Sequence, residues 1–415
     1  MKLLFVVLLL ASWSRATAQR QCLAFDYQQA ELRQDPSLLL RLESIENFTK
    51  QQSNAGQNLA LRPGQTAIIT IPVVVHIIYH YPSERINEAQ VLRQIEILNR
   101  DFRRMNADSV KTPSVFKRIA ADAEIEFKLA TVDPKGRATN GIIYKYSPIM
   151  MWESNDKMKF SRETGSDAWD SKSYLNIWVC YLGGLAGYSS FPGGPAEKDG
   201  VVLDYGAFGP TGNSAYGLGR TAVHEVGHWL NLKHTWGDAN CGDDKVDDTP
   251  RQSNYTVGCP STVRISCGNA PNGDMYMNFM DFTNDACINL FTLGQKARMR
   301  ALFAPGGARA SILSSNGLGI PQNHEIPLPD ASPRWLFTKI YPVPARDELT
   351  FDISSDERWI GKMISIVNLQ GQVIKQTLIT SRIQKINISN LQPGVYFLTA
   401  KKEDWGSIKE KFIKL

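Results

Sequence analysis

The sequence predicts an α+β domain followed by a small all-β sandwich. Between residues 67 and 305, apolar runs rich in β-branched residues alternate with segments whose apolar residues recur at helical spacing. Beyond residue 335 the pattern changes to short alternating runs separated by turn residues, which is typical of a β-sandwich. Residues 306–334 are rich in proline and glycine and are predicted to form an interdomain linker.

The composition is that of a globular protein. Hydrophobic residues make up 43% of the chain and charged residues 21%, which excludes a disordered, collagen-like or coiled-coil protein. The 46 basic and 41 acidic residues leave a net charge of only +5, dispersed along the chain. Because nucleic-acid binding needs a concentrated basic surface, we expect no nucleic-acid partner.

The N-terminus has the pattern of a secretory signal peptide. Lys2 precedes the apolar run LLFVVLLLA, which is closed by Ala16-Thr17-Ala18, a cleavage site of small residues. A membrane-spanning helix needs about 20 apolar residues, so this run is too short and we expect no transmembrane segment in the mature chain. We predict that residues 1–18 are removed and that the protein is secreted, to the extracellular space or the outer cell surface. Disulfides can form there.

A polar segment is predicted to precede the first domain. Residues 19–54 are rich in glutamine, leucine and charge, with weak helical periodicity at 38–45, and are predicted to form a small pro-segment or arm. Residues 55–305 then carry the α+β domain. Its strands are expected at 67–79, 125–132, 174–182 and 200–203, and its helices at 86–105, 219–232 and 292–303.

The C-terminal domain, residues 335–415, is predicted to be a small β-sandwich. It contains no cluster of catalytic residue types, so a module that binds carbohydrate or protein is one interpretation. Its strands are expected at 348–353, 363–367, 372–378, 383–388, 394–400 and 408–413.

The residues that carry chemistry are concentrated in the segment HEVGHWLNLKH, residues 224–234. His224 and His228 are spaced i and i+4 on the predicted helix, so both imidazoles can reach one ion. His234 can supply a third ligand if the helix ends and the chain turns back. Glu225 lies beside these ligands, where its carboxylate can take a proton from a zinc-bound water. The motif therefore predicts a hydrolytic zinc site with Glu225 as general base and then acid.

Two other interpretations of this motif are weaker. An accidental match on a buried helix is disfavoured because three of the six histidines of the chain fall in this one segment. A purely structural zinc would normally fill its fourth position with a protein ligand, and it would not need a glutamate beside it.

Four of the six cysteines lie close together just past the middle of the chain, while Cys22 and Cys180 stand apart. In a secreted protein such a cluster indicates two disulfides in a loop-rich region, and the residues themselves leave three pairings open. The absence of a C-x2-C pair argues against a four-cysteine zinc site. The clustered cysteines are Cys241, Cys259, Cys267 and Cys287.

Five aspartates lie within the segment 238–248. A solvated run of charge explains them without any ligand. A carboxylate-rich loop held by disulfides also suits the oxygen ligands of calcium. The residues alone do not decide between these two interpretations.

The long histidine motif resembles that of the metzincin clan of zinc peptidases. It departs from the clan pattern at Asn231, where glycine is usual; asparagine is the non-glycine residue that best tolerates a positive φ. Within the clan the sequence is similar to the pappalysin family over about residues 55–305. The matching segments are GLAGYSSFPGGP (184–195), DGVV (199–202), HTW (234–236), DDTP (247–250) and NFMDF (278–282), together with the cysteine spacing.

The resemblance implies a metzincin-type catalytic domain with a twisted mixed sheet, an active-site helix and a loop-rich C-terminal subdomain. It implies a methionine turn at Met280 beneath the zinc, and an edge strand near 184–190 that aligns a peptide by strand addition. Family members usually carry tyrosine two residues after this methionine, and here the residue is Phe282. A step assisted by that tyrosine is therefore not expected.

The resemblance also selects among the open alternatives. It implies the disulfides Cys241–Cys267 and Cys259–Cys287. It also favours calcium binding over a solvated run of charge as the explanation of the acidic segment. The calcium ligands we expect are Asp244, Asp247, Asp248 and Thr249.

Cys22 and Asp285 receive roles from the same resemblance. Cys22 resembles a pro-segment cysteine that blocks the open position of zinc; a disulfide with Cys180, or a lone thiol, is the alternative. Asp285 matches an aspartate that closes the pocket for the residue after the scissile bond, which predicts cleavage before Arg and then Lys. The alternative is a loop carboxylate that lies in water or caps the helix near Thr292.

The C-terminal domain is similar to type IX secretion sorting domains through IYPVPA (340–345), GVYF (394–397) and KFIKL (411–415). The resemblance thus implies the type IX secretion machinery as a partner, beside protein and peptide substrates. We expect a secreted zinc- and calcium-dependent endopeptidase that is made as a latent zymogen. The alternative is a surface adhesin with a structural zinc site.

Overall fold

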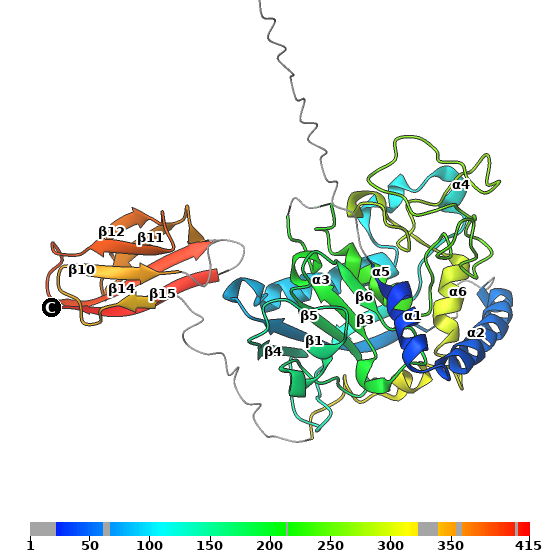
Figure 1. The fold of residues 1–415 in the computed structure, drawn as a ribbon, viewed down its shortest axis with the longest axis horizontal. Coiled ribbons are helices and arrows are strands. Elements are labelled where there is room, and N and C mark those ends of the chain that lie inside the picture. Colours follow the sequence, from blue (N-terminus) through cyan, green and yellow to red (C-terminus); the bar gives the residue numbers. More distant parts are fainter. Residues whose placement is uncertain (1–21, 61–66, 213–214, 323–338, 354–358, 403–405) are drawn as a thin grey trace, which may run out of the picture.

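The computed structural model describes residues 22–60, 67–212, 215–322, 339–353, 359–402 and 406–415 (Figure 1). The expected signal peptide, residues 1–18, lies outside the described residues. The expected α+β domain and the all-β domain are both present, and each is described by itself below.

The first domain is built around a mixed sheet in the order β3-β1-β5-β7-β6, with β4 paired to β1 beyond the end of β3. All pairs are parallel except that of β6 with β7, and β6 forms the edge. β1 is buried along nearly its whole length, which explains its continuous run of apolar residues. The strands are β1 (Ile69–Tyr79), β3 (Ile125–Leu129), β4 (Ile142–Tyr146), β5 (Leu175–Cys180), β6 (Gly187–Ser189) and β7 (Val201–Asp204).

Helices and short 3-10 turns complete this domain. The apolar sides of α3 and α5 meet the sheet in one core, which includes Val91, Leu98, Val223 and Trp229. The helices are α3 (Glu88–Phe102), α4 (Ser114–Lys117), α5 (Arg220–Trp229) and α6 (Leu293–Ala301); a two-residue ribbon pairs β2 (Ala120–Ala121) with β8 (Phe291–Thr292). The 3-10 helices are η1 (Pro82–Glu84), η2 (Ala107–Lys111), η3 (Lys157–Lys159), η4 (Ser161–Glu163), η5 (Ala196–Lys198), η6 (Tyr205–Ala207), η7 (Asp285–Cys287) and η8 (Ala310–Ser314).

The N-terminal segment forms two helices, α1 (Ala24–Gln34) and α2 (Leu38–Ala60). α1 contacts the edge strand β6, and α2 contacts α6 (Figure 1). The predicted boundary between residues 54 and 55 falls inside α2, which continues to residue 60. The weak periodicity seen at 38–45 is the start of this longer helix.

The described start of the predicted linker belongs to the first domain. Ile312 of η8 is buried in the main core, and the carbonyl of Gly317 accepts hydrogen bonds from the amides of Thr131 and Val132. Arg309 donates to the buried carboxylate of Asp199 at 2.5 and 2.8 Å. These contacts outweigh the proline and glycine content that suggested a free linker from residue 306 onward.

The C-terminal domain is an all-β structure of two antiparallel sheets, as expected. One has the order β13-β10-β9 and the other β12-β11-β14-β15, around a core that includes Phe351, Leu398 and Phe412. The strands are β9 (Lys339–Tyr341), β10 (Glu348–Asp352), β11 (Met363–Val367), β12 (Val373–Leu378), β13 (Ile383–Asn387), β14 (Gly394–Lys402) and β15 (Gly406–Lys414). Among the described residues, no helix has the length and apolarity needed to cross a membrane.

Candidate metal centre and active site

Helix α5 and the turn after it bring the three histidines together. The helix ends at Trp229, and Asn231 follows with φ +66°, the left-handed conformation expected at this position. The amide of Leu232 then bonds the carbonyl of Gly227 at 2.9 Å, which closes the turn. The chain is thereby directed back so that His234 lies beside the two helical histidines.

The Nε2 atoms of the three histidines face one another. The distance is 3.1 Å from His228 to His224, 3.1 Å from His228 to His234, and 3.3 Å from His224 to His234. All three side chains are buried.

Each Nδ1 faces an oxygen acceptor, which decides which nitrogen carries the proton. Nδ1 of His224 is 2.7 Å from the carbonyl oxygen of Phe279, and Nδ1 of His228 is 2.8 Å from that of Leu232. Nδ1 of His234 is 2.5 Å from Oδ1 of Asp238. Because these acceptors require a proton on Nδ1, the three Nε2 lone pairs point at one another.

This donor set fits a zinc ion. Tetrahedral zinc holds imidazole nitrogens at about 2.0–2.1 Å, which places them roughly 3.3 Å apart. The observed separations are close to that value, and three converging lone pairs are unfavourable without a cation between them. Carbonyl and carboxylate oxygens that accept from Nδ1–H are the groups that usually orient metal-binding histidines. Asp238 therefore supports His234, whereas the sequence had placed it only within the acidic run.

Glu225 and Cys22 complete the centre. Glu225 is fully buried on the same helix, and its Oε2 lies 3.4 Å from Sγ of Cys22. Sγ of Cys22 and one ring nitrogen from each histidine all lie within 4.8 Å of one another, the one such group of four found among the described residues. Burial, and next the charge of Glu225, raise the pKa of the Cys22 thiol, so a thiolate here would require a cation.

The alternative role for Cys22 as a disulfide partner of Cys180 is wrong. Both thiols are free and buried, and Cys180 is the last residue of β5. The other four cysteines form Cys241–Cys267 and Cys259–Cys287, the pairs that the resemblance implied. These disulfides cross-link the loops between α5 and α6.

Met280 lies directly beneath α5. A Cβ on Gly227 would come within 2.5 Å of the Met280 sulfur, so any larger residue here would force the Met280 side chain to move. Two residues on, Phe282 packs against the rings of His224 and His234, with centroids at 5.7 and 4.9 Å. No hydroxyl is present at this position.

Trp236 also supports the centre, although no role was predicted for its side chain. Its ring stacks on His234 with centroids 4.2 Å apart and planes within 6°. The signal was available, because an aromatic residue follows the last histidine by two positions. The stack holds the His234 ring in the orientation that its bond to Asp238 sets.

The edge strand β6 borders the centre, as the segment near 184–190 was expected to do. Gly187 forms a parallel bridge with Cys22, and its carbonyl accepts from the amide of Leu23 at 3.4 Å. A side chain at Gly187 would crowd Val202 O and approach Cγ of Glu225 at 3.3 Å. The N-terminal segment therefore occupies the strand edge that was expected to align a peptide.

The acidic segment does not gather its three predicted calcium-binding aspartates. Asp244 accepts from the Thr249 hydroxyl at 2.7 Å and is buried, and burial raises its pKa to about 7. Asp248 instead accepts from the Thr292 hydroxyl and the Gly294 amide at the start of α6. Asp247 is exposed. Within the described chain these aspartates do not converge on one point.

Asp285 lies at the N-terminal end of α5. It is fully buried, and its Oδ2 accepts from the amides of Leu218 and Arg220 at 3.0 and 3.2 Å. It therefore neither lies in water nor caps the helix near Thr292, where Asp248 bonds the Gly294 amide and Thr292 forms a capping box with Gln295. The alternative interpretation of Asp285 is wrong in both of its forms.

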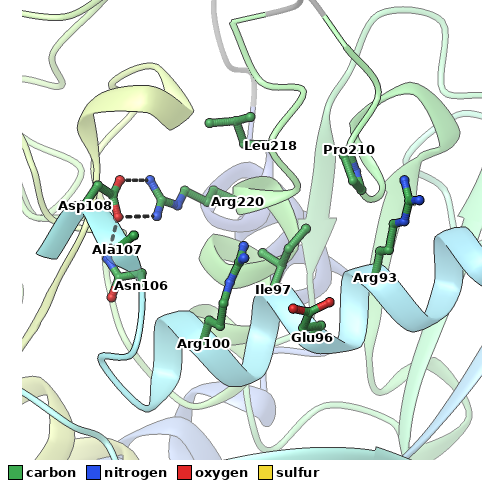
Figure 2. A pocket seen from close by; sticks show the side chains of 10 residues that line it. All are labelled: Arg93, Glu96, Ile97, Arg100, Asn106, Ala107, Asp108, Pro210, Leu218 and Arg220. Atoms are coloured by element: carbon green, nitrogen blue, oxygen red, sulfur yellow. Dashed lines mark hydrogen bonds and ion pairs between the residues drawn. The ribbon is translucent and has the colours of Figure 1, made fainter.

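A separate pocket of about 410 Å³ lies between α3 and the start of α5 (Figure 2). Arg220 on its wall faces Asp108 and also pairs with Asp101, and its guanidinium donates to the carbonyls of Asp285 and Ile288. No lining residue belongs to the histidine centre. The arginine is thus fully engaged in anchoring the first turn of α5.

Comparison with known proteins places this geometry among peptidases. Residues 159–304 match the family model described as Pregnancy-associated plasma protein-A, and residues 339–415 match the secretion system C-terminal sorting domain. The chain is 30% identical over 282 residues to an extracellular metalloprotease of Pyricularia oryzae, covering 64% of this chain and 85% of that protein.

Solved structures with the same fold include two forms of one bacterial protein. A promirolysin mutant of Tannerella forsythia is 43% identical, with a TM-score of 0.65, and the match covers 73% of this chain and 100% of that one. Mature mirolysin in complex with a cleaved peptide is 48% identical, with a TM-score of 0.59, over 60% of this chain and 96% of that one.

Proposed function

This chain belongs to the pappalysin family of zinc metalloproteases, and on that premise we propose that it is a latent endopeptidase whose Glu225 acts as the general base. The sorting domain at its C-terminus and its extracellular relatives make it a secreted or cell-surface protein that uses type IX secretion. The observation that carries the proposal is the convergence of three Nε2 lone pairs beside the buried carboxylate of Glu225.

The side chains of the centre divide the hydrolysis between them. A zinc ion held by His224, His228 and His234 would lower the pKa of a bound water and polarise the scissile carbonyl. Glu225 would take a proton from the attacking water and then deliver it to the departing amine nitrogen. Strand β6 would align the peptide by backbone hydrogen bonds, at the edge where Leu23 now bonds Gly187.

Latency would come from the N-terminal helices. Cys22 lies among the three histidine nitrogens and beside Glu225, so a thiolate there would take the fourth zinc position and exclude the attacking water. The supporting comparison is with a promirolysin, a protein named as a precursor. Removal of residues up to about 60 would open both the centre and the strand edge.

Two finer proposals concern calcium and specificity. Asp244 and the Thr249 hydroxyl would help to bind a calcium ion, which would compensate the burial of the Asp244 carboxylate. Asp285 would favour arginine, and then lysine, after the scissile bond, because its buried carboxylate lies at the start of the helix that carries His224. Asp247 and Asp248 lie close to this site in the sequence, but they are not proposed as direct ligands of the calcium ion.

Substitution of Glu225 tests the proposal. The Glu225→Gln chain is first cleaved by added active enzyme to remove its N-terminal segment. Its kcat/KM on a casein-derived peptide should then be about 100- to 10,000-fold lower than that of the wild type. It should keep one zinc per chain and its melting temperature. The matched control is Glu88→Gln, an exposed position on α3 that should leave activity unchanged.

The alternative, a surface adhesin with a structural zinc, predicts a different result. If the wild-type chain cleaves no protein or peptide after removal of the N-terminal segment, although zinc is bound, then the endopeptidase proposal is wrong. The adhesin would then be tested by binding of the C-terminal domain to carbohydrate and protein arrays.

A further inference from the structure

A tyrosine of the N-terminal segment enters a pocket that belongs to the catalytic domain. Tyr27 of α1 is only 6% exposed, and its hydroxyl donates to Oδ2 of Asp156 at 2.8 Å. Its ring lies 5.1 Å from the ring of Tyr188, the central residue of the edge strand β6. The pocket therefore adjoins the strand that receives the peptide.

Three features of the catalytic domain hold Asp156 without help from Tyr27. Oδ1 of Asp156 accepts from Nζ of the fully buried Lys159 at 2.8 Å and from the Tyr188 hydroxyl at 3.1 Å. Lys198 approaches Oδ2 at 3.4 Å from the pocket rim. These partners lie outside the N-terminal segment, so its departure leaves the acceptor in place.

The walls of the pocket suit an aromatic ring. The ammonium of Lys159 lies 5.2 Å from the ring centroids of Tyr27, Trp178 and Tyr188, which is within cation–π range. Met158 and Leu182 belong to the same buried apolar cluster as these rings. A tyrosine side chain in this pocket thus packs against apolar residues, has the Lys159 ammonium near its ring and can donate from its hydroxyl to Asp156.

The charge of the pocket favours a neutral phenol over a basic side chain. In the latent chain, Lys159 and Lys198 face Asp156 and Glu31, and Glu31 lies 3.3 Å from Lys198. Glu31 departs with the N-terminal segment, and the pocket then holds two cations against one carboxylate. A lysine or arginine there would meet net repulsion, whereas a phenol can still donate to Oδ2 of Asp156.

We propose that this pocket is a substrate subsite of the activated enzyme that selects a tyrosine side chain, which Tyr27 occupies in the latent form. The subsite deepens the proposed endopeptidase function and rests on it. It is separate from the histidine centre, because Tyr27 lies five residues along the chain from Cys22 and contacts Asp156 and Tyr188, neither of which belongs to that centre. Its ligand is a tyrosine of an extended peptide that pairs with β6.

A peptide-library profile of the activated enzyme is the first test. We expect tyrosine to be enriched over phenylalanine by about three- to tenfold at one position at least two residues from the scissile bond, as expected for a lost hydrogen bond to a charged acceptor. Asp156→Asn should abolish this preference, while the matched variant Glu163→Gln, at a partly exposed site in η4, should keep it. Cleavage with no tyrosine preference in the wild type would overturn the subsite and leave the endopeptidase intact. Absence of any cleavage would instead refute the endopeptidase itself.

A second measurement keeps the proposal testable if Asp156→Asn fails to fold. A synthetic peptide of residues 22–34, with serine in place of Cys22 so that it cannot bind zinc, should inhibit the activated wild-type enzyme. Changing Tyr27 of this peptide to Phe should weaken inhibition by about three- to tenfold, and changing it to Ala by more than about thirtyfold. Equal inhibition by all three peptides would overturn the proposal, since the pocket would then not recognise the ring or its hydroxyl.

Discussion

The sulfur of Cys22 lies 3.4 Å from Oε2 of Glu225, the carboxylate that is proposed to act on water. Both side chains are buried, and the same sulfur faces the three histidine nitrogens. In the proposed mechanism, one residue of the N-terminal segment would therefore block both the fourth zinc position and the general base. The thiol and the attacking water would compete for the same space.

Substitution of Cys22 should weaken latency. We expect Cys22→Ser to speed autoactivation of the full chain about tenfold or more, because the hydroxyl is a far poorer zinc ligand than a thiolate. The rate is measured by the appearance of the shortened chain on a gel. Cys180→Ala, at the other free buried cysteine, is the control and should activate at the wild-type rate. An unchanged rate for Cys22→Ser would mean that the helices alone maintain latency.

A second anchor of the N-terminal segment lies on α2, and it reaches the turn that follows α5. Glu46 of α2 forms a two-point ion pair with the buried Arg298 of α6, with one contact at 2.8 Å, and Arg298 also donates to the Asn231 carbonyl. Glu46→Gln should speed activation about three- to thirtyfold, because it leaves the guanidinium underpaired. Activity after activation should not change, since Glu46 is then gone. Glu43→Gln, exposed on the same helix, should behave as wild type; an effect of equal size there would point to helix propensity instead.

Local patterns were enough to predict most of the elements and the centre of the site. The i, i+4 histidines and the positive φ of Asn231 follow from the helix and the turn that the sequence itself specifies. The strands of the C-terminal domain other than β9 were predicted because their turns and alternation are local. β6, the edge strand near 184–190, was placed only through the family resemblance, because three residues carry too little periodicity.

Contacts between distant segments could not be predicted from the sequence. Tyr27 meets Asp156 across 129 positions, and Glu46 meets Arg298 across 252. No short pattern encodes such pairs, since each depends on how α1 and α2 dock. The same limit applies to the start of the predicted linker, where Ile312 packs in the main core, and to the predicted boundary after residue 54, across which α2 continues.

Calcium should stabilise the catalytic domain if Asp244 helps to bind it. Adding EGTA to zinc-replete enzyme should lower the melting temperature by several degrees; saturation at about 100 times the Kd contributes roughly 2.7 kcal/mol. Asp244→Asn should remove most of this response. Asp243→Asn, an exposed neighbour that pairs with Lys245, should keep it. A melting temperature insensitive to EGTA in the wild type would exclude calcium from the fold.

The buried carboxylate of Asp281 should make stability depend on pH. Burial raises its pKa to about 6, although Gln252 and the amides of Thr256 and Phe282 donate to it. Because the folded pKa exceeds the unfolded value, this group stabilises the fold below about pH 4, and the contribution is lost as pH rises through about 6. The full effect is on the order of 3 kcal/mol. Relative to Asp281→Asn, the wild type should therefore lose melting temperature between about pH 4 and pH 7; parallel curves would refute the shift.

Asp285 provides the last prediction, on specificity. Asp285→Asn should lower kcat/KM for peptides with Arg after the scissile bond by about 2–4 kcal/mol, the usual penalty when one partner of a buried charge pair is lost. Asparagine can still accept from the amides of Leu218 and Arg220, so α5 should keep its position. The control is a matched peptide with leucine in place of arginine, whose cleavage should change little. An equal loss on both peptides would mean that Asp285 only holds the helix that carries His224. A wild-type profile without any preference for Arg or Lys at this position would remove the carboxylate from substrate recognition altogether.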